Sequence, residues 1–366
     1  MFDRRLVSNF DWSLLLSSLL VSALGIVNLY STGSISSGPG ITPLYLKQFY
    51  WLLVGLFLFF TIVTIDYQFV ARYAYLLHGL SLLLLLIALL WAKPTAGTHR
   101  WLQIGGLSFQ PSEFAKITLV LLLSRSFSGV SMSDAEQFRG IALPSFFTAL
   151  TFLLVFLEPD LGTAALFVLV FFSFFFLIKL DLKNIFLFIS SGAVLLPCAW
   201  FFLEDYQKGR LISFFNPGKD SLRAGYQAIQ SKIAIGSGML FGKGFGIGTQ
   251  SQLRFLPEQH TDFAFSVWAE EWGFFGALML VLVLFFILSK GLKIAAQSRD
   301  RLGSFVSVAL VLILFWQVVI NISMVSGLFP TVGIPLPFVS YGGSSLVSTW
   351  IIIGILQNIR MRKLVF

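Results

Sequence analysis

The stretch FLPEQHTDFAFSVWAEEWGFFGALMLVLVLFFILS, residues 255–289, decides the fold, because an acidic cluster leads directly into a long apolar run. The run from 264 to 289 is long enough to cross a bilayer, which takes about 20 apolar residues in a helix. Only 17 of the 366 residues are acidic, yet four stand at the start of this run: Glu258, Asp262, Glu270 and Glu271. The sequence therefore predicts a membrane-spanning helix with concentrated charge at one end.

The composition extends this prediction to the whole chain. Hydrophobic residues make up 57%, charged residues 11%, and the mean hydropathy is +0.85. Soluble domains carry roughly 25% charged residues, and no soluble core needs so many apolar ones. Three histidines and a single cysteine exclude a zinc cluster, a c-type haem motif and a disulfide framework, and Cys198 is interpreted as a packing residue. We predict an all-α, polytopic integral membrane protein.

Long apolar runs predict about ten transmembrane helices. Their expected ranges are 11–30, 47–65, 73–91, 112–125, 141–157, 161–178, 185–203, 264–289, 303–326 and 343–358. The first is interpreted as a retained helix, because no small-residue cleavage site stands out after it. An even number of spans puts both termini on one side. That side carries 14 lysines and arginines against three in the short loops opposite, so both termini are expected to be cytoplasmic.

A large extracytoplasmic loop, at about 204–263, departs from this charge pattern. It holds seven basic residues and one acidic residue between Tyr206 and Phe255, a net charge of +6: Lys208, Arg210, Lys219, Arg223, Lys232, Lys243 and Arg254 against Asp220. Long loops cross membranes whatever their charge, so an ordinary solvated loop is one explanation. The mixture of basic, aromatic and aliphatic residues in GYQAIQSKIAIGSGMLFGKGFG, 225–246, instead favours a segment in the headgroup plane that binds an anionic, lipid-attached headgroup.

Asp262 is the first candidate for chemistry. If Thr261 caps a helix that begins at Asp262, five small residues lie within about 60° of the aspartate. They are Ser266, Ala269, Gly273, Gly276 and Ala277. Such a face packs against other helices or borders a cavity, so the carboxylate is expected to point into the bundle. The helix N-terminus favours the anion and desolvation favours the acid, which predicts a base near neutrality; a bare capping charge is the alternative.

Glu270 and Glu271 point in other directions on the same helical wheel, at about 80° and 180° from Asp262. We expect these two residues to pair with neighbours or to orient the helix.

A second polar cluster is expected on the same side of the membrane. HRWLQIGGLSFQPSEFAK, 99–116, ends in a Pro-Ser helix start that sets Glu113 and Lys116 one turn apart in the fourth span. Ionisable residues inside a span are costly and suggest function, although a structural ion pair is the alternative. Arg100 and Trp101, just before them, would supply a cation and a stacking surface.

EPDLGTA, 158–164, forms a third polar spot, at the hairpin between the fifth and sixth spans. Glu158 and Asp160 would either hold a divalent cation or pair with Lys116, and the sequence does not choose between these.

The last outer loop, SGLFPTVGIPLPFVSYGGSSL, 326–346, contains three prolines that forbid a regular helix. Non-helical backbone at membrane depth is tolerated only where it is buried in protein or lines a wet cavity, so this loop is expected to wall a cavity.

Four of these stretches, in this order, resemble the SEDS family of bacterial shape, elongation, division and sporulation proteins. They are RWLQIGGLSFQPSEFAK, EPDLGTA, FLPEQHTDFAFSVWAEEWGFFG and GIPLPFVSYGGSS. The match runs from the first span to the last, and residues 226–263 resemble the elongation branch more than the division branch. The resemblance implies one transmembrane domain over residues 1–366, in the bacterial cytoplasmic (inner) membrane, with an extracytoplasmic active site.

The resemblance also implies a function and partners. Members are peptidoglycan glycosyltransferases that polymerise lipid II, releasing undecaprenyl pyrophosphate, and work with a class B penicillin-binding protein. Other elongation-complex proteins are expected partners, and nucleic acid is not. A lipid II flippase and a scaffold for the penicillin-binding protein are the alternatives.

Residue by residue, Asp262 matches the family's catalytic aspartate, and Glu113 and Lys116 match its glutamate-lysine pair. Asp160 lies in its acidic hairpin. The other expected substrate-binding residues are Arg100, Trp101, Glu258, His260 and Ser344. No tightly bound cofactor is expected. The sequence does not decide whether a divalent cation, Mg²⁺ or Mn²⁺, binds at Asp160 or Asp262.

The expected reaction inverts the anomeric carbon of the donor sugar, which needs a base for the acceptor hydroxyl and cations for the departing pyrophosphate. Asp262 would be the base, and Lys116, Arg100 and the basic loop would hold the pyrophosphate.

Overall fold

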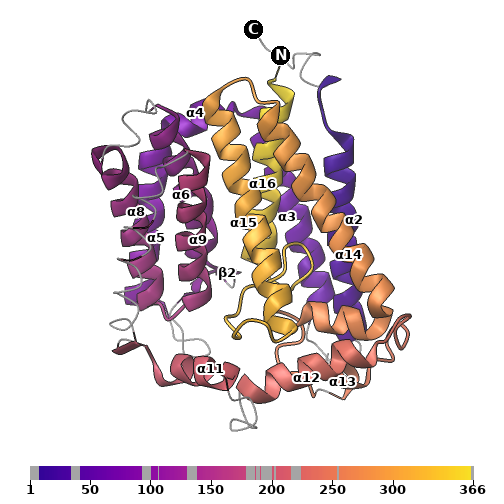
Figure 1. Cartoon of the computed structure of the whole chain (residues 1–366). Coiled ribbons are helices and arrows are strands. Elements are labelled where there is room, and N and C mark those ends of the chain that lie inside the picture. Colours follow the sequence, from indigo (N-terminus) through magenta and orange to yellow (C-terminus); the bar gives the residue numbers. More distant parts are fainter. Residues whose placement is uncertain are drawn as a thin grey trace. The chain divides into compact units, whose positions relative to one another are not determined.

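The computed structural model describes most of the chain, and within that part the fold is almost entirely helical (Figure 1). The described residues are 8–33, 42–92, 100–105, 107–129, 138–178, 186, 190, 200–201, 203–215, 224–253 and 255–363. The prediction of an all-α polytopic membrane fold is confirmed.

Helices occupy nine of the ten predicted spans within the described residues. They are α2 (Trp12–Gly33), α3 (Leu44–Thr64), α5 (Ala74–Trp91), α6 (Pro111–Ser128), α8 (Phe138–Leu157), α9 (Leu161–Leu177), α14 (Ala264–Ala296), α15 (Arg301–Val325) and α16 (Gly343–Met361). Six of them, α2, α3, α5, α8, α14 and α15, are long and apolar enough to cross a membrane. The seventh predicted span, 185–203, lies largely outside the described residues, and Cys198 lies wholly outside them.

Shorter elements fill the connections. They are α4 (Tyr67–Arg72), β1 (Leu102–Ile104), β2 (Leu107–Phe109), α11 (Asp205–Phe215), α12 (Ala224–Ser237) and α13 (Thr249–Gln252). The two strands form an antiparallel hairpin with Leu102 opposite Phe109, which the sequence analysis did not predict. The sequence signal for this hairpin is the pair of glycines, Gly105 and Gly106, between two short stretches in which apolar and polar residues alternate.

The chain folds into two compact units that are interleaved in sequence. Unit 1 contains residues 1–64, 209–293 and 317–366, and unit 2 contains residues 65–208 and 294–316.

In unit 1, contacts at one end of the helices place both chain ends on the same side. Lys290, late in α14, lies 3.4 Å from Asp11, just before α2. Arg362, just after α16, donates hydrogen bonds to the carbonyls of Val63 and Thr64 at the end of α3. The start of α2 and the end of α16 therefore lie at one end of unit 1, which agrees with an even number of spans.

The core of unit 1 is built around the pairing of α3 with α16. The Trp350 ring is fully buried and packs edge-on against the rings of Phe59 and Phe338, at 5.7 and 6.0 Å. Gln48 of α3 donates to the carbonyl of Ser340 and accepts from the N–H of Gly342. The loop 326–342 is non-helical, as its prolines predicted, and its residues 336–340 are buried while Leu328 and Phe329 are exposed.

Helix α14 is kinked at Gly273, whose φ of 64° and ψ of −163° are not helical. At the kink the N–H groups of Phe274 and Phe275 donate to the carbonyls of Met239 and Leu240. A side chain at position 273 would meet this paired backbone, so glycine is required there. The predicted small-residue face therefore does not continue past Gly273, because the helix changes direction.

Helix α12 of the large loop lies across the end of unit 1 at which α14 begins (Figure 1). The hydroxyl of Ser231 in α12 lies 2.7 Å from the hydroxyl of Ser266 in α14 and donates to the carbonyl of Val325 at the end of α15. This part of the large loop is therefore docked on the helix ends.

The core of unit 2 contains a buried histidine. His78 of α5 is fully buried, and its ring nitrogens lie 3.1 Å from the hydroxyl of Thr118 in α6 and 3.0 Å from that of Thr151 in α8. These contacts join three helices and fix α6, the helix that carries Glu113 and Lys116.

Candidate active site

Asp262 lies in a turn that precedes α14, two residues before the first helical residue. The prediction that Thr261 caps a helix beginning at Asp262 is wrong. The Thr261 hydroxyl instead donates to the backbone and side-chain oxygens of Glu258, and Glu258 has a positive φ of 50°. The chain turns tightly here and enters the helix only after Phe263, which is buried.

Two other elements hold this turn in place. The side-chain amide of Asn321 in α15 donates to the carbonyl of Asp262, at 3.0 Å, and to the carbonyl of Ile334, at 2.8 Å. The carbonyl of His260 accepts the N–H of Tyr341, and its Nδ1 lies 2.9 Å from the hydroxyl of Thr32 in α2. The turn is thereby tied to α2, to α15 and to the loop 326–342.

The carboxylate of Asp262 lies against the loop 326–342. Its Oδ2 is 3.4 Å from the position that a Cβ on Gly333 would occupy, and Gly333 has a φ of +74°. A glycine here allows the loop backbone to approach the carboxylate closely. Of the other predicted residues in unit 1, Glu258 is exposed in the same turn, and Ser344 is buried in the first turn of α16.

Glu270 and Glu271 pair with neighbours, as predicted. The Glu270 carboxylate is fully buried and accepts from Lys243 Nζ at 2.7 Å and from the N–H groups of Gln250 and Ser251. Glu271 accepts the hydroxyl of Ser31 in α2. Glu270 therefore anchors the glycine-rich segment 242–252 to the start of α14.

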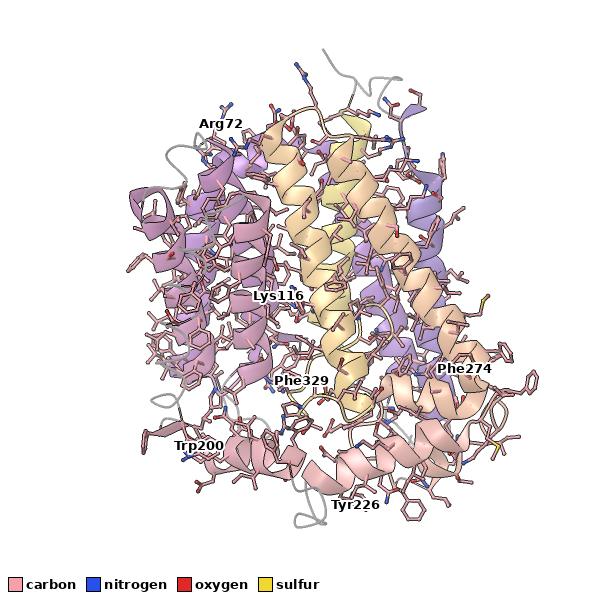
Figure 2. All side chains as sticks on the ribbon, viewed as in Figure 1. Arg72, Lys116, Trp200, Tyr226, Phe274 and Phe329 are labelled. Atoms are coloured by element: carbon pink, nitrogen blue, oxygen red, sulfur yellow. The ribbon has the colours of Figure 1, made fainter. Side chains whose placement is uncertain are left out.

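In unit 2, Glu113 and Lys116 form an ion pair in the first turns of α6. Lys116 is labelled in Figure 2. The distance from Lys116 Nζ to Glu113 Oε1 is 2.8 Å, and each side chain is only 3% exposed. Pro111 begins the helix, as its sequence predicted. Because a helix N-terminus favours negative charge, Glu113 is well placed in the first turn. The predicted i, i+3 spacing is confirmed.

Asp160 caps α9 and is held by several donors. Its Oδ1 accepts the N–H of Thr163, and its Oδ2 accepts from the Thr163 hydroxyl, Arg100 Nη1 and the Gln110 side chain. The predicted alternative of a pair with Lys116 is wrong, because Asp160 pairs with Arg100 at 3.3 Å. Trp101 follows Arg100 and is half-buried.

The metal alternative at Asp160 fits poorly, because both carboxylate oxygens are already used as acceptors. Among the described residues, no group of three or more His, Cys, Asp and Glu side chains is arranged to hold a metal ion.

Glu158 was not assigned a role of its own by the sequence analysis. Its side chain is fully buried, and within the described part of the chain neither carboxyl oxygen has a hydrogen-bond partner. The pKa of Glu158 is raised to about 8, mainly by burial and also by the negative charge of Asp160, while Arg100 opposes the rise. The group is therefore mainly a neutral acid at pH 7.

The Glu158→Gln variant should lose a pH dependence of stability. In the unfolded chain the carboxyl loses its proton near pH 4.5, whereas in the folded chain it does so near pH 8. Between these values only the folded state holds the proton, so wild-type stability falls as the pH rises and levels off above about pH 8. Melting curves in detergent from about pH 5 to pH 9 should show a decrease of a few degrees that is absent in Glu158→Gln. The variant Glu204→Gln, at an exposed acid, should keep the wild-type slope.

Two further residues escaped the sequence analysis as individual site residues. Asn321 had a usable signal, since a polar amide in an apolar span suggests a specific contact. Arg210 of α11 donates from Nη1 to the carbonyl of Thr331 at 3.2 Å, beside the loop that carries Gly333. It was one of seven basic residues in the large loop, and nothing in the sequence separated it from the others.

These features define a polytopic membrane protein with a fixed aspartate at one end of its helices and a buried Glu-Lys pair in a separate unit. A family model described as "Cell cycle protein", which covers FtsW, RodA and SpoVE, matches residues 11–364. The chain belongs to this family, and the resemblance to the SEDS proteins is confirmed.

Individual relatives agree with this assignment. The chain is 43% identical over 288 residues to the peptidoglycan glycosyltransferase MrdB of Escherichia coli K12, covering 78% of this chain and 77% of that one. It is 32% identical to the peptidoglycan glycosyltransferase RodA of Treponema pallidum, covering 98% of this chain and 99% of the relative. The fold matches a chain from a solved peptidoglycan synthase complex that coordinates polymerization and crosslinking, with a TM-score of 0.82, 30% identity, and 97% and 98% of the two chains covered.

Proposed function

We propose that this protein is a peptidoglycan glycosyltransferase that polymerises lipid II into β-1,4 glycan strands during cell elongation. The observation that carries the proposal is the placement of Asp262, in a turn fixed by Asn321 and Tyr341 with its carboxylate against the loop 326–342. The names of the MrdB and RodA relatives support the reaction class.

In the proposed reaction Asp262 is the general base. It takes the proton of the acceptor 4-hydroxyl, whose oxygen attacks the anomeric carbon of the donor sugar. The bond from that carbon to the pyrophosphate oxygen breaks, the carbon is inverted, and undecaprenyl pyrophosphate leaves with the electron pair. Cations are needed where that negative charge develops, and Lys116 and Arg100 are proposed for this role with the basic loop.

The other predicted residues are proposed as substrate ligands. Glu258 and His260 lie in the turn of Asp262, Ser344 lies at the start of α16, and Trp101 follows Arg100. Asp160 is proposed to act by holding Arg100, to which it is bonded.

A divalent cation, if Mg²⁺ or Mn²⁺ is used, is proposed to bind at Asp262 together with pyrophosphate oxygens rather than at Asp160. One or two carboxylates plus substrate phosphates are the usual Mg²⁺ ligands. Isothermal titration of Mg²⁺ and Mn²⁺ into the protein, with and without undecaprenyl pyrophosphate, tests this. Binding that appears only with the pyrophosphate and is lost in Asp262→Asn supports the site, and binding that survives in Asp262→Asn contradicts it.

The proposed protein partner is a class B penicillin-binding protein, within the elongation complex. The relative in the solved synthase complex supports an assembly of this kind. Polymer yield at a fixed concentration of the chain should rise when such a transpeptidase is co-purified, and an equal yield would count against the partnership.

The proposed location is the bacterial cytoplasmic membrane, with Asp262 outside and both termini inside. In a Cys198→Ser background, a cysteine at the exposed position of Asp205 should react with an impermeant maleimide added to intact cells. A cysteine at Ser298, between α14 and α15, should react only after permeabilisation. Labelling of both from outside would contradict this topology.

The direct test of the function is glycan synthesis by the purified chain in detergent, from lipid II alone. Polymer of increasing length is the expected product, and it should disappear in a matched Asp262→Asn preparation. A lipid II flippase would make no polymer under these conditions, because detergent abolishes the two sides between which it transports. A scaffold would make none without its partner's own activity.

A further inference from the structure

A hollow in unit 1 lies between α11, α12 and the loop 326–342. It contains about 330 Å³ of space, part of it open to solvent, and none of the residues that line it is acidic. Two cations line it, Arg210 from α11 and Lys232 from α12, together with Phe329 and Thr331 of the loop. Phe329, labelled in Figure 2, marks the loop side of this hollow.

The two cations are held in different ways. The guanidinium of Arg210 is fixed by its bond to the carbonyl of Thr331, at 3.2 Å. The side chain of Lys232 passes directly over Gly327, whose φ is +71°, and a Cβ on that glycine would overlap the lysine side chain. Gly327 therefore makes room for the lysine, and the backbone of one loop positions both cations around one hollow. Such a concentration of one charge favours an anionic ligand.

A buried hydroxyl gives a second, independent indication of a ligand. Thr331 is only 7% exposed, and within the described part of the chain its Oγ1 has no hydrogen-bond partner. Buried hydroxyls in proteins are nearly always bonded, so this one is expected to bond a group that enters the hollow. Thr331 lines the hollow and its own carbonyl accepts from Arg210, so the hydroxyl and the guanidinium belong to one small site.

This hollow adjoins Asp262. The position of a Cβ on Gly333 is 3.4 Å from Asp262 Oδ2 and 3.9 Å from Arg210 Nη1. The distance from Asp262 Oδ2 to Arg210 Nη1 therefore cannot exceed the sum of these two distances. A ligand phosphate held by Arg210 would therefore lie on the same side of the loop 326–342 as the proposed base.

We infer that Arg210, Lys232 and Thr331 form a subsite for the diphosphate of a lipid-linked substrate, beside the proposed base Asp262. The identity of the substrate rests on the proposed function. The preference for a diphosphate rests on the residues that line the hollow. Arginine presents a planar fork that matches phosphate oxygens, lysine adds a point charge, and a threonine hydroxyl donates to a third oxygen. When the sugar is transferred, the same groups face the diphosphate oxygens on which the negative charge develops.

The test is equilibrium binding of undecaprenyl pyrophosphate to the purified full-length chain in detergent. Arg210→Gln should weaken binding about tenfold or more, because it removes a charge-assisted pair of bonds. Lys232→Gln and Thr331→Val should each weaken it severalfold. Lys293→Gln, which removes one charge at an exposed position late in α14, is the matched control and should bind like wild type.

Binding of a second lipid distinguishes a site for the substrate diphosphate from a site for the phosphate of an ordinary membrane lipid. Phosphatidylglycerol in mixed micelles presents a single anionic headgroup, and its binding should change less than twofold in all four variants. An equal loss of both lipids would show a general anionic surface and overturn the assignment to the substrate. Unchanged binding of undecaprenyl pyrophosphate in Arg210→Gln and Lys232→Gln would overturn the subsite itself.

The result of this experiment does not depend on whether the proposed activity is correct, because it measures lipid binding and not polymer synthesis. A wild-type chain that binds undecaprenyl pyrophosphate through these residues but makes no glycan would keep the subsite and lose the proposed activity. If Arg210→Gln does not fold, Lys232→Gln and Thr331→Val decide the matter. Lys232 is exposed, and the valine keeps the volume of the threonine.

Discussion

Asp262→Asn should reduce glycan polymer formation by a factor of about 10² to 10⁴, the usual range for loss of a general base. Asparagine keeps the shape of the side chain and can still donate and accept hydrogen bonds, but it cannot take the acceptor proton. The bonds from Asn321 and Tyr341 that hold the turn use the backbone carbonyls of Asp262 and His260, so they survive the change. The measurement is the initial rate of polymer formation from lipid II by the purified variant in detergent.

The interpretation of that loss depends on two controls. Folding should change by no more than about 1 kcal/mol, because the residue is only partly buried and its backbone bonds remain. Binding of lipid II should persist, since it is assigned mainly to the cations. A variant that polymerises at nearly the wild-type rate would remove Asp262 from the chemistry. One that also loses lipid II binding would make it a substrate ligand.

A matched variant in the same acidic cluster tests whether the rate depends on the position of Asp262 or only on the total negative charge of the cluster. Glu270→Gln removes a carboxylate eight residues later that is fully buried and bonded to Lys243 and to the segment 242–252. If Asp262 is the base, Glu270→Gln should affect the stability of the fold more than Asp262→Asn does, and the rate per folded molecule less. Equal effects on that rate would indicate that the cluster acts through its summed charge.

The helices followed from the sequence because a span is a local pattern. The apolar runs that predicted 264–289 and 343–358 correspond to α14, Ala264–Ala296, and α16, Gly343–Met361. The kink at Gly273 did not follow from that pattern. It depends on backbone bonds to Met239 and Leu240, more than thirty residues earlier in the chain, and a helical wheel cannot represent a partner at that distance.

The site shows the same division between local and distant contacts. The pair Glu113 and Lys116 was predictable because residues three apart on a helix are neighbours. Asp160 was expected to bind Lys116 or a cation, but its partner is Arg100, sixty residues earlier in the chain. That pairing depends on how the β1–β2 hairpin and the α8–α9 hairpin come together, and neither strand of β1–β2 was predicted.

The position of Asp262 was predicted in part. Its place near the start of α14 and its approach to other elements were expected from the sequence, but the turn was not. Glu258 has a positive φ and binds Thr261, so Thr261 is used within the turn and does not cap a helix. Capping preferences describe helix starts in general, and here the hydrogen bond from Asn321, at a distance of 59 residues, fixes a different local structure.

Glu113→Lys should abolish activity and strongly destabilise unit 2. It removes one member of an ion pair whose side chains are each 3% exposed, and it places a second cation one turn from Lys116. Breaking a buried pair by removing one partner typically costs about 3–5 kcal/mol, because the remaining charge is left uncompensated. The new lysine also stands in the first helical turn, where the helix dipole disfavours positive charge. Thermal unfolding in detergent and the polymerisation rate are the measurements.

The double variant Glu113→Lys with Lys116→Glu distinguishes a structural pair from a catalytic one. The ion pair can re-form with its charges exchanged, so most of the lost stability should return, less roughly 1 kcal/mol for the reversed helix-dipole interaction. Activity should stay low if Lys116 serves the pyrophosphate, because the cation now lies one turn away from its place. Full recovery of polymer synthesis would show that the pair is structural. The negative charge leaving with the pyrophosphate would then have to be met by Arg100 and the basic loop alone, in which Arg210 approaches the same glycine, Gly333, as Asp262 does.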